Sequence, residues 1–117
     1  MAAIFEHRKI ESNDLGNDEL KFPVDAILTN LSPEDHSNLS SGKSPELVVK
    51  DDQGGTHRLT IKNQSGKICF TYGWKKFINE KAIKKNDEIS LYREDNHFDP
   101  GAQCTYRIEV KKAKRDR

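Results

Sequence analysis

The stretch TYGWKKFINEKAIKKNDEISLYRE, residues 71–94, carries the strongest structural pattern in this chain of 117 residues. Trp74, Phe77 and Ile78 are spaced i, i+3 and i+4, which places them on one face of a helix. The lysine, asparagine and glutamate residues at 75, 76, 79 and 80 fall on the opposite face. From residue 88 the apolar residues alternate with a period of two, which is typical of a strand. The stretch therefore predicts a short amphipathic helix packed on a sheet, followed by a strand.

The composition predicts one globular domain with a heavily charged surface. Hydrophobic and charged residues each make up 33% of the chain. No apolar run reaches the roughly 18 residues that a membrane-spanning helix needs, and the first residues lack the apolar segment of a signal peptide. We expect a single domain over residues 1–117, with a structured part at about 4–110, a flexible basic tail at 111–117 and no membrane association.

The net charge is only +1, but the charges are unevenly distributed. Residues 1–53 contain five Lys or Arg and eleven Asp or Glu, whereas residues 54–93 contain nine and three. A localised basic region is typical of a surface that binds a polyanion. Charge alone leaves a second interpretation open, in which the two halves neutralise each other in the folded protein.

Short alternating segments separated by Gly, Asn, Asp and Pro predict seven strands. We place them at 3–8, 20–22, 46–50, 57–62, 67–71, 88–92 and 105–110. Pro23 and the apolar spacing after it favour a helix at 24–31, and the polar segment 32–44 is predicted to be a loop. Together with the helix that begins near Trp74, this predicts a mainly β fold, a seven-stranded open barrel with two short α-helices.

The sequence gives little support for catalysis or metal binding. Cys69 and Cys104 lie far apart in alternating segments, which favours two buried thiols. The four histidines are scattered, so we expect no zinc site. Glu109 and Lys111 fit half of a metal-dependent nuclease motif, but Asp99 and the residues around it do not complete the motif. We expect no catalytic residues, no cofactor, no metal and no small-molecule substrate.

The segment FTYGWKKFINE at 70–80, with Ile83, the NDEI at 86–89 and Leu91, resembles the plant B3 DNA-binding domain. The LKFP at 20–23 and the hairpin at 51–61 are similar to other parts of that family. The resemblance implies an open seven-stranded pseudobarrel that binds double-stranded DNA in the major groove through two loop arms. It also implies a transcription factor in the nucleus, with protein partners in a transcription complex. The basic run at 111–115 is a candidate nuclear import signal.

The two arms implied by the resemblance contain the candidate DNA-binding residues. In the first arm, residues 8–19, these are Arg8, Lys9, Ser12, Asn13 and Asn17. In the second arm, residues 62–67, they are Lys62, Asn63, Gln64, Ser65 and Lys67. Asn and Gln can pair bidentately with adenine, and Lys can contact phosphate or guanine. Without the resemblance, an ordinary polar hairpin remains the simpler interpretation of the second arm.

Some residues depart from the family pattern. Asn86 stands where the family usually has Gly, and Asn tolerates a left-handed backbone. His57 occupies a position that is often Trp, which predicts a thinner core there. The four acidic residues of the first arm should repel phosphate. These features look more similar to reproductive-meristem-like members than to auxin-response members.

Two alternatives remain open on the same fold. One is a protein-interaction module with weak or non-specific DNA binding, in which the acidic half contacts a basic partner. The other is the recognition domain of a restriction-type nuclease, because such domains share the pseudobarrel.

Overall fold

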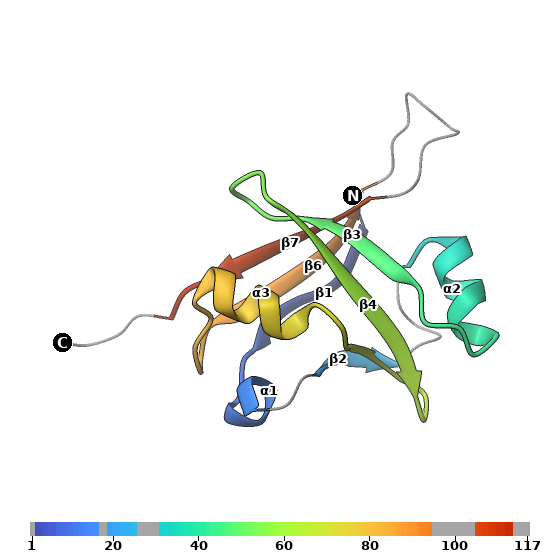
Figure 1. Ribbon diagram of the computed structural model, residues 1–117, viewed down its shortest axis with the longest axis horizontal. Helices are drawn as coiled ribbons and strands as arrows, with labels where there is room; N and C mark the ends of the chain where they lie inside the picture. Colours follow the sequence, from blue (N-terminus) through green and yellow to red (C-terminus); the bar gives the residue numbers. More distant parts are fainter. Residues whose placement is uncertain (1, 17–18, 26–30, 95–104, 114–117) are drawn as a thin grey trace.

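The computed structural model describes residues 2–16, 19–25, 31–94 and 105–113 (Figure 1). The described residues form seven strands and three helices. Their order and bounds are β1 (Ala2–Lys9), α1 (Ser12–Gly16), β2 (Leu20–Asp25), α2 (Pro33–Ser40), β3 (Glu46–Lys50), β4 (Thr56–Gln64), β5 (Lys67–Phe70), α3 (Trp74–Lys81), β6 (Glu88–Glu94) and β7 (Thr105–Lys111). The predicted mainly β fold with seven strands is confirmed.

The strands form one curved sheet in the order β1-β6-β7-β3-β4-β5-β2. Neighbouring strands are antiparallel except β3 and β7, which pair in parallel at Val49 with Tyr106 and at Lys50 with Arg107. The two edge strands, β1 and β2, approach each other and nearly close the barrel. Arg8 of β1 spans this opening, because its Nε donates to the Lys21 carbonyl of β2 at 3.2 Å.

The inside of the barrel is filled by a row of aromatic side chains. Phe5, Phe22 and Phe70 meet edge-on with ring centroids 5.0 and 4.8 Å apart. The row continues through Trp74, which stacks on Phe70 at 6.0 Å and on Phe77 at 5.9 Å. Helix α3 therefore contributes its apolar face to the core, as its spacing predicts.

Helix α3 depends on backbone positions in the left-handed region. Gly73, just before the helix, has φ = 89°, and a Cβ there would lie 2.2 Å from the Arg58 carbonyl oxygen. Only glycine avoids this clash with a neighbouring strand. Asn86, in the turn before β6, has φ = 76°, which confirms the left-handed backbone predicted at this position.

The predicted helix at 24–31 is wrong at both of its ends, the part of it that the structure describes. Val24 and Asp25 are the last residues of β2, residues 26–30 lie outside the described residues, and Leu31 belongs to no regular element. Helix α2 occupies most of the following segment, which was predicted to be a loop. With α1 and α3, it brings the described helices to three rather than two.

Tertiary contacts explain why α2 forms in a segment without a helical apolar pattern. The Ser32 side chain caps the helix by accepting from the Asp35 N–H at 3.3 Å, and Pro33 suits the first turn. The Tyr106 hydroxyl donates to the Asp35 carboxylate at 2.5 Å and accepts from the Ser32 N–H at 3.1 Å. Strand β7 thereby fixes the start of α2, and Leu39 anchors its end in the core.

The beginning of the predicted flexible tail is ordered. Lys111 ends β7, and the Lys112 ammonium donates to the Ala82 carbonyl at 2.8 Å, after the end of α3. The Ala113 N–H donates to the buried Asp87 carboxylate at 2.9 Å. Burial alone would raise the pKa of Asp87, but hydrogen bonds from the N–H groups of Ala113 and Lys84 and from the Lys112 ammonium to its carboxylate lower it. Residues 114–117 lie outside the described residues.

His57 does not leave the core thin, contrary to expectation. Its ring packs edge-on against Phe77 at a centroid distance of 4.9 Å. Its two ring nitrogens lie 2.7 Å from the Asp51 carboxylate and 3.3 Å from that of Glu80. The imidazole thus fills the space between β4 and α3 and joins a polar cluster.

In the part of the chain that the structure describes, no helix is long and apolar enough to cross a membrane.

Candidate nucleic-acid interface

The second arm is the tip of a tight hairpin. Gln64 pairs with Lys67, and the two residues between them have φ = 53° at Ser65 and 89° at Gly66. Positive φ at both central residues defines a turn that matches the twist of antiparallel strands. The alternation of β4 directs Ile61 into the barrel and the exposed Lys62 outward. The hairpin therefore presents Lys62 and Gln64 on the outer face of the barrel.

The C-terminal end of the first arm lies beside the second arm. Strand β2, which follows the first arm, pairs with β5 at Leu20 with Phe70 and at Lys21 with Cys69. The Gln64 amide also donates to the Glu19 carboxylate at 3.2 Å. In Figure 1, α1 and the tip of the β4–β5 hairpin lie at the same side of the barrel, with β2 between them. Both arms thus border one surface.

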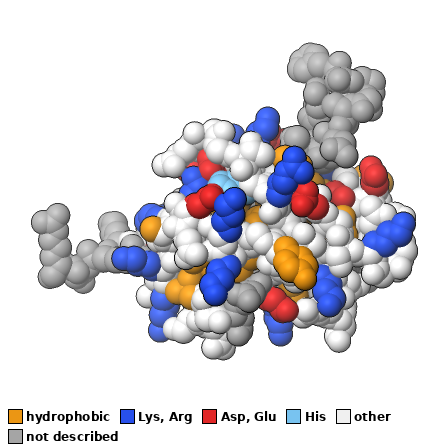
Figure 2. All heavy atoms as spheres, in the orientation of Figure 1, with side chains coloured by type: hydrophobic (Ala, Val, Ile, Leu, Met, Phe, Trp, Pro, Cys, Tyr) orange, Lys and Arg blue, Asp and Glu red, His pale blue; other side chains and the backbone are white. Residues whose placement is uncertain are grey.

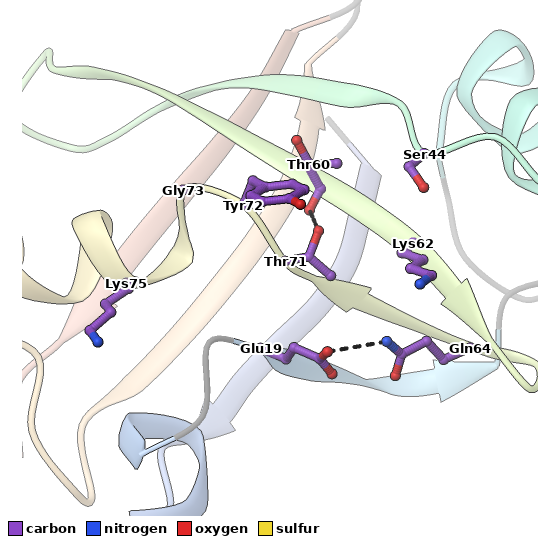
Figure 3. A pocket seen from close by; sticks show the side chains of 9 residues that line it. All are labelled: Glu19, Ser44, Thr60, Lys62, Gln64, Thr71, Tyr72, Gly73 and Lys75. Carbon is purple, nitrogen blue, oxygen red and sulfur yellow. Dashed lines mark hydrogen bonds between the residues drawn. The ribbon is translucent and has the colours of Figure 1, made fainter.

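That surface contains a pocket of about 510 Å³ on the outer face of β4 and the β5–α3 connection. Tyr72 lines this pocket. Its side chain is 82% exposed, and among the described residues no other large hydrophobic side chain is exposed. Figure 3 shows lysine amines on two sides of the pocket and hydroxyl groups between them. The lining residues are Glu19, Ser44, Thr60, Lys62, Gln64, Thr71, Tyr72, Gly73 and Lys75.

The charge of this outer face is predominantly positive. The exposed lysines are Lys21 of β2, Lys62 and Lys67 of the second arm and Lys75 of α3. Figure 2 shows Lys and Arg side chains spread over the face that carries β4 and α3. The carboxylate within the pocket, that of Glu19, accepts the hydrogen bond from Gln64. A polyanion would meet four lysines around the pocket, where the one carboxylate among the described lining residues is already hydrogen-bonded.

Arg8, predicted to contact DNA, is bound within the first arm. Its guanidinium donates to the Lys21 carbonyl at 3.2 Å, to the Lys9 carbonyl and to the Asp14 carboxylate at 3.1 Å. Asp14 is therefore neutralised by an ion pair, although the sequence predicts that its charge repels phosphate. Its carboxylate also accepts from the Glu11 N–H at 2.7 Å, and its carbonyl accepts from the Trp74 indole at 3.2 Å. Helix α1 is thus tied directly to the core.

The other first-arm candidates remain predictions. Lys9, Ser12 and Asn13 are exposed among the described residues. Asn17 lies outside the described residues, as does Asp18. The first arm is therefore held to the barrel by Arg8 and Asp14 and carries exposed polar side chains.

The second-arm amides already make hydrogen bonds inside the protein. The Asn63 side-chain carbonyl accepts from the Gly66 N–H at 3.0 Å and closes the turn. The Gln64 amide donates to Glu19 at 3.2 Å and lies 3.8 Å from the Cys69 sulfur on its carbonyl side. Both ends of the Gln64 amide are thus engaged, whereas Asn63 is exposed and, among the described residues, bonds through its oxygen alone.

The Cys69 thiol is buried beneath this face. Burial raises the pKa of Cys69, and the nearby Glu19 carboxylate adds to the effect. The sulfur therefore stays a neutral thiol at ordinary pH, in agreement with the predicted buried cysteine. Cys104 lies outside the described residues.

Several pocket residues escape the sequence patterns. Tyr72 and Lys75 flank the buried Trp74, and their exposure follows from how α3 enters the core. Thr60 and Thr71 meet because the Thr71 N–H donates to the Thr60 carbonyl at 2.8 Å, which extends the β4–β5 pairing. The outward alternation of Thr60 with Lys62 is the one sequence signal that could have indicated this surface.

Within the described residues, no group of three or more His, Cys, Asp or Glu could hold a metal ion.

A barrel that presents lysines, amides and an exposed tyrosine between two arms has the features of a polyanion-binding domain. This chain belongs to the family of the B3 DNA binding domain, whose family model matches residues 5–105. A B3 domain-containing protein of Arabidopsis thaliana is 39% identical over 49 residues, which cover 41% of each chain.

A solved structure shares the architecture. The barrel matches that of an Arabidopsis FUS3–DNA complex with a TM-score of 0.64, over 96% of this chain and 99% of that one. The sequence identity is 14%, so this similarity supports the fold alone.

Proposed function

We propose that this protein binds double-stranded DNA through the surface between its two arms and regulates transcription. The observation that carries the proposal is the meeting of the two arms at the lysine-lined pocket, through the β2–β5 pairing and the Gln64–Glu19 hydrogen bond. Membership of the B3 DNA binding domain family supports DNA as the polyanion. The Arabidopsis FUS3–DNA complex adds support, because a protein of the same fold is bound to DNA there.

Phosphate contacts would position the protein on the duplex. Lys62, Lys67 and Lys75 are exposed on the outer face beside the second arm, and lysine binds phosphate as a point charge. Thr60 and Thr71 hydroxyls line the floor of the same pocket, where they can also contact phosphate oxygens. Lys9 and the polar side chains of α1 would add contacts from the first arm. The proposal therefore assigns most of the affinity to the outer face of β4 and α3.

Base reading in the major groove would fall mainly to Asn63. Its carbonyl closes the turn with Gly66, which leaves the side-chain NH₂ to donate to an acceptor on a base edge. Bidentate pairing with adenine would require the turn hydrogen bond to break. Gln64 would act chiefly by holding Glu19, so we assign it a positioning role. The proposal includes location in the nucleus and partners in a transcription complex.

Affinity for duplex DNA should fall steeply with salt. Four to six neutralised phosphates give a log–log slope of about −4 to −5. Binding of the full chain to a fluorescent random duplex pool between 50 and 200 mM salt would measure this slope. A flat or absent response at low salt would contradict DNA binding and favour the protein-interaction alternative. The alanine substitutions Lys62→Ala and Lys75→Ala should each reduce the slope by about one.

The matched control for these substitutions is Lys111→Ala. Lys111 is also an exposed strand lysine, but it lines a different depression together with His7 and Glu88. Its loss should leave the slope unchanged. Equal effects of all three substitutions would indicate that binding depends on total charge and not on the proposed surface.

Replacing Asn63 by alanine should relax sequence preference. Loss of a base contact costs about 1–3 kcal/mol of discrimination, and Asn63→Ala also removes the turn hydrogen bond. We expect non-specific affinity to persist, because the lysines remain. Selection from a randomised duplex library with the wild type and Asn63→Ala would measure the preference. An unchanged preference in Asn63→Ala would assign base reading to another part of the surface.

A further inference from the structure

Ser44 lies directly opposite Lys62 on the outer face of the barrel. The β3–β4 register pairs Glu46 with Thr60, and the Ile61 N–H donates to the Pro45 carbonyl at 3.0 Å just beyond the strand. Continuing this antiparallel register by one more residue sets Ser44 against Lys62. Side chains that face each other in this way have Cβ atoms about 5 Å apart. Both residues line the pocket between the arms (Figure 3).

The chain contains two Ser-Pro pairs, and the structure separates them clearly. Ser32 is buried, and its hydroxyl is held in the cap of α2, where it donates to Asp35 at 2.8 Å. Ser44 is exposed, and so are the four residues before it. Its hydroxyl makes no hydrogen bond to any described residue, whereas those of Ser40 and Ser41 donate to helix carbonyls at 2.9 and 2.6 Å.

The backbone around Ser44 also suits a protein kinase. Ser44 lies between α2 and β3 in a segment without regular structure. The following proline disfavours helix and favours extended backbone at Ser44. A proline-directed kinase selects a serine followed by proline in an extended segment. Among the described serines, Ser44 combines this sequence with exposure and an unengaged hydroxyl.

We propose that Ser44 is a phosphorylation site for a proline-directed kinase, and that its phosphate pairs with Lys62 and weakens DNA binding. In the transfer, the Ser44 oxygen attacks the γ-phosphorus of ATP, its proton passes to the general base of the kinase, and ADP leaves. The product carries a charge of about −1.5 to −2 and three strong acceptor oxygens. The inference rests on the proposed function, because the phosphate would act on the surface that is proposed to bind DNA.

The phosphate would act on DNA binding in two ways. It would engage the Lys62 ammonium in a charge-assisted hydrogen bond, which withdraws that lysine from the DNA backbone. It would also place negative charge at the rim of the pocket, where it repels the phosphates of the duplex. We expect affinity for the random duplex pool at 100 mM salt to fall about tenfold, with a salt slope smaller by about one.

The purified full chain would be incubated with ATP and a proline-directed kinase of the mitogen-activated type. Mass spectrometry would then locate the phosphate. We expect one phosphate, at Ser44, which is lost in Ser44→Ala and retained in the control Ser41→Ala. No incorporation at Ser44, or incorporation mainly at Ser32, overturns the proposal. DNA affinity is then compared between the phosphorylated and unphosphorylated chains, and an unchanged affinity also overturns it.

A second readout does not depend on DNA. The phosphorus NMR shift of the phosphorylated chain, followed against pH, reports the second phosphate pKa, which is about 6 for an isolated phosphoserine. Pairing with Lys62 should lower this pKa, and Lys62→Met should restore it. An unchanged value in the wild type overturns the pairing. Failure of the unphosphorylated chain to bind any duplex would instead reject the proposed function. The phosphorus NMR titration would still test the pairing of the phosphate with Lys62.

Discussion

Replacing Trp74 by alanine should lower the free energy of unfolding by about 4 kcal/mol, a typical cost for removing a fully buried indole. The ring is completely buried and stacks between Phe70 and Phe77 at 6.0 and 5.9 Å. The substitution would open a cavity at the junction of α3 and the barrel. It would also leave the Asp14 carbonyl, which accepts the indole N–H at 3.2 Å, without its partner.

Urea unfolding followed by far-ultraviolet circular dichroism would measure this effect, because the chain has one Trp and its fluorescence disappears with the substitution. Trp74→Phe keeps an aromatic ring in the core but loses the N–H and the volume of the second ring, so it should cost about 1–2 kcal/mol, less than the alanine substitution. The exposed neighbour gives the control, since Tyr72→Ala should change stability by less than about 0.5 kcal/mol. A loss below about 1.5 kcal/mol for Trp74→Ala would show that the aromatic row does not organise the core.

The Trp74→Phe variant also tests how the first arm is held. The indole hydrogen bond joins α1 to the core over a separation of 60 residues. Without it, backbone amides at 11–16 should exchange hydrogen faster, while those of the strands remain protected. DNA binding should weaken in the same variant if the first arm contributes to the interface.

Replacing Asp51 by asparagine should lower the free energy of unfolding by about 3 kcal/mol, because it removes one charge from a buried cluster. The Asp51 carboxylate lies 2.6 Å from the Lys81 ammonium and 2.7 Å from the His57 ring. It also accepts from the N–H groups of Gln53 and Gly55, both at 2.8 Å. The cluster joins the β3–β4 turn to the end of α3, so its loss should loosen both.

The same carboxylate should make stability depend on pH. Burial alone would raise the pKa of Asp51, but the hydrogen bonds from Lys81, His57 and the two backbone N–H groups outweigh it and hold the pKa well below the usual range. A depressed folded-state pKa means that the stabilisation is fully present above the unfolded value of 3.8 and is lost as the pH falls below it. Stability should therefore decline steadily from about pH 4 to pH 2.

Urea titrations at several pH values would compare the wild type, Asp51→Asn and the exposed control Asp52→Asn. Asp51→Asn should show a shallower acid dependence, with a residual slope from Asp87, whose pKa is also lowered. Asp52→Asn should follow the wild type, because that side chain is exposed. Parallel curves for the wild type and Asp51→Asn would contradict the assigned role of Asp51.

Much of the fold could be predicted because strands and α3 leave local patterns. The period of two in β4 and the i, i+3, i+4 spacing after Gly73 are visible within a few residues. Helix α2 could not be predicted in this way, because its start depends on Ser32, Asp35 and the Tyr106 hydroxyl, the last from a strand about 70 residues later. The predicted start of a helix after Pro23 was wrong, since the pairing of β2 with β5 continues to Asp25 and overrides local preference there.

The candidate site was less predictable than the fold. Residue types alone indicate that Arg8, Asn63 and Gln64 can bind DNA, but not which atoms remain available. Arg8 is engaged with Asp14, and the Gln64 amide with Glu19, so their first role is internal. The acidic residues of the first arm were expected to repel phosphate, yet Asp14 is neutralised by Arg8.

By itself, the sequence determined the class of fold, the seven strands, the position of α3 and the membership of the B3 DNA binding domain family that the family model confirms. These properties follow from local periodicity and from the residue pattern around Gly73 and Trp74. Only the tertiary structure decided that the two arms share one surface and that Tyr72, Lys75 and Ser44 border it with Lys62. The physical reason is that hydrogen-bond and charge partners lie 45 to 60 residues apart in the sequence, and no local pattern encodes which of them will meet.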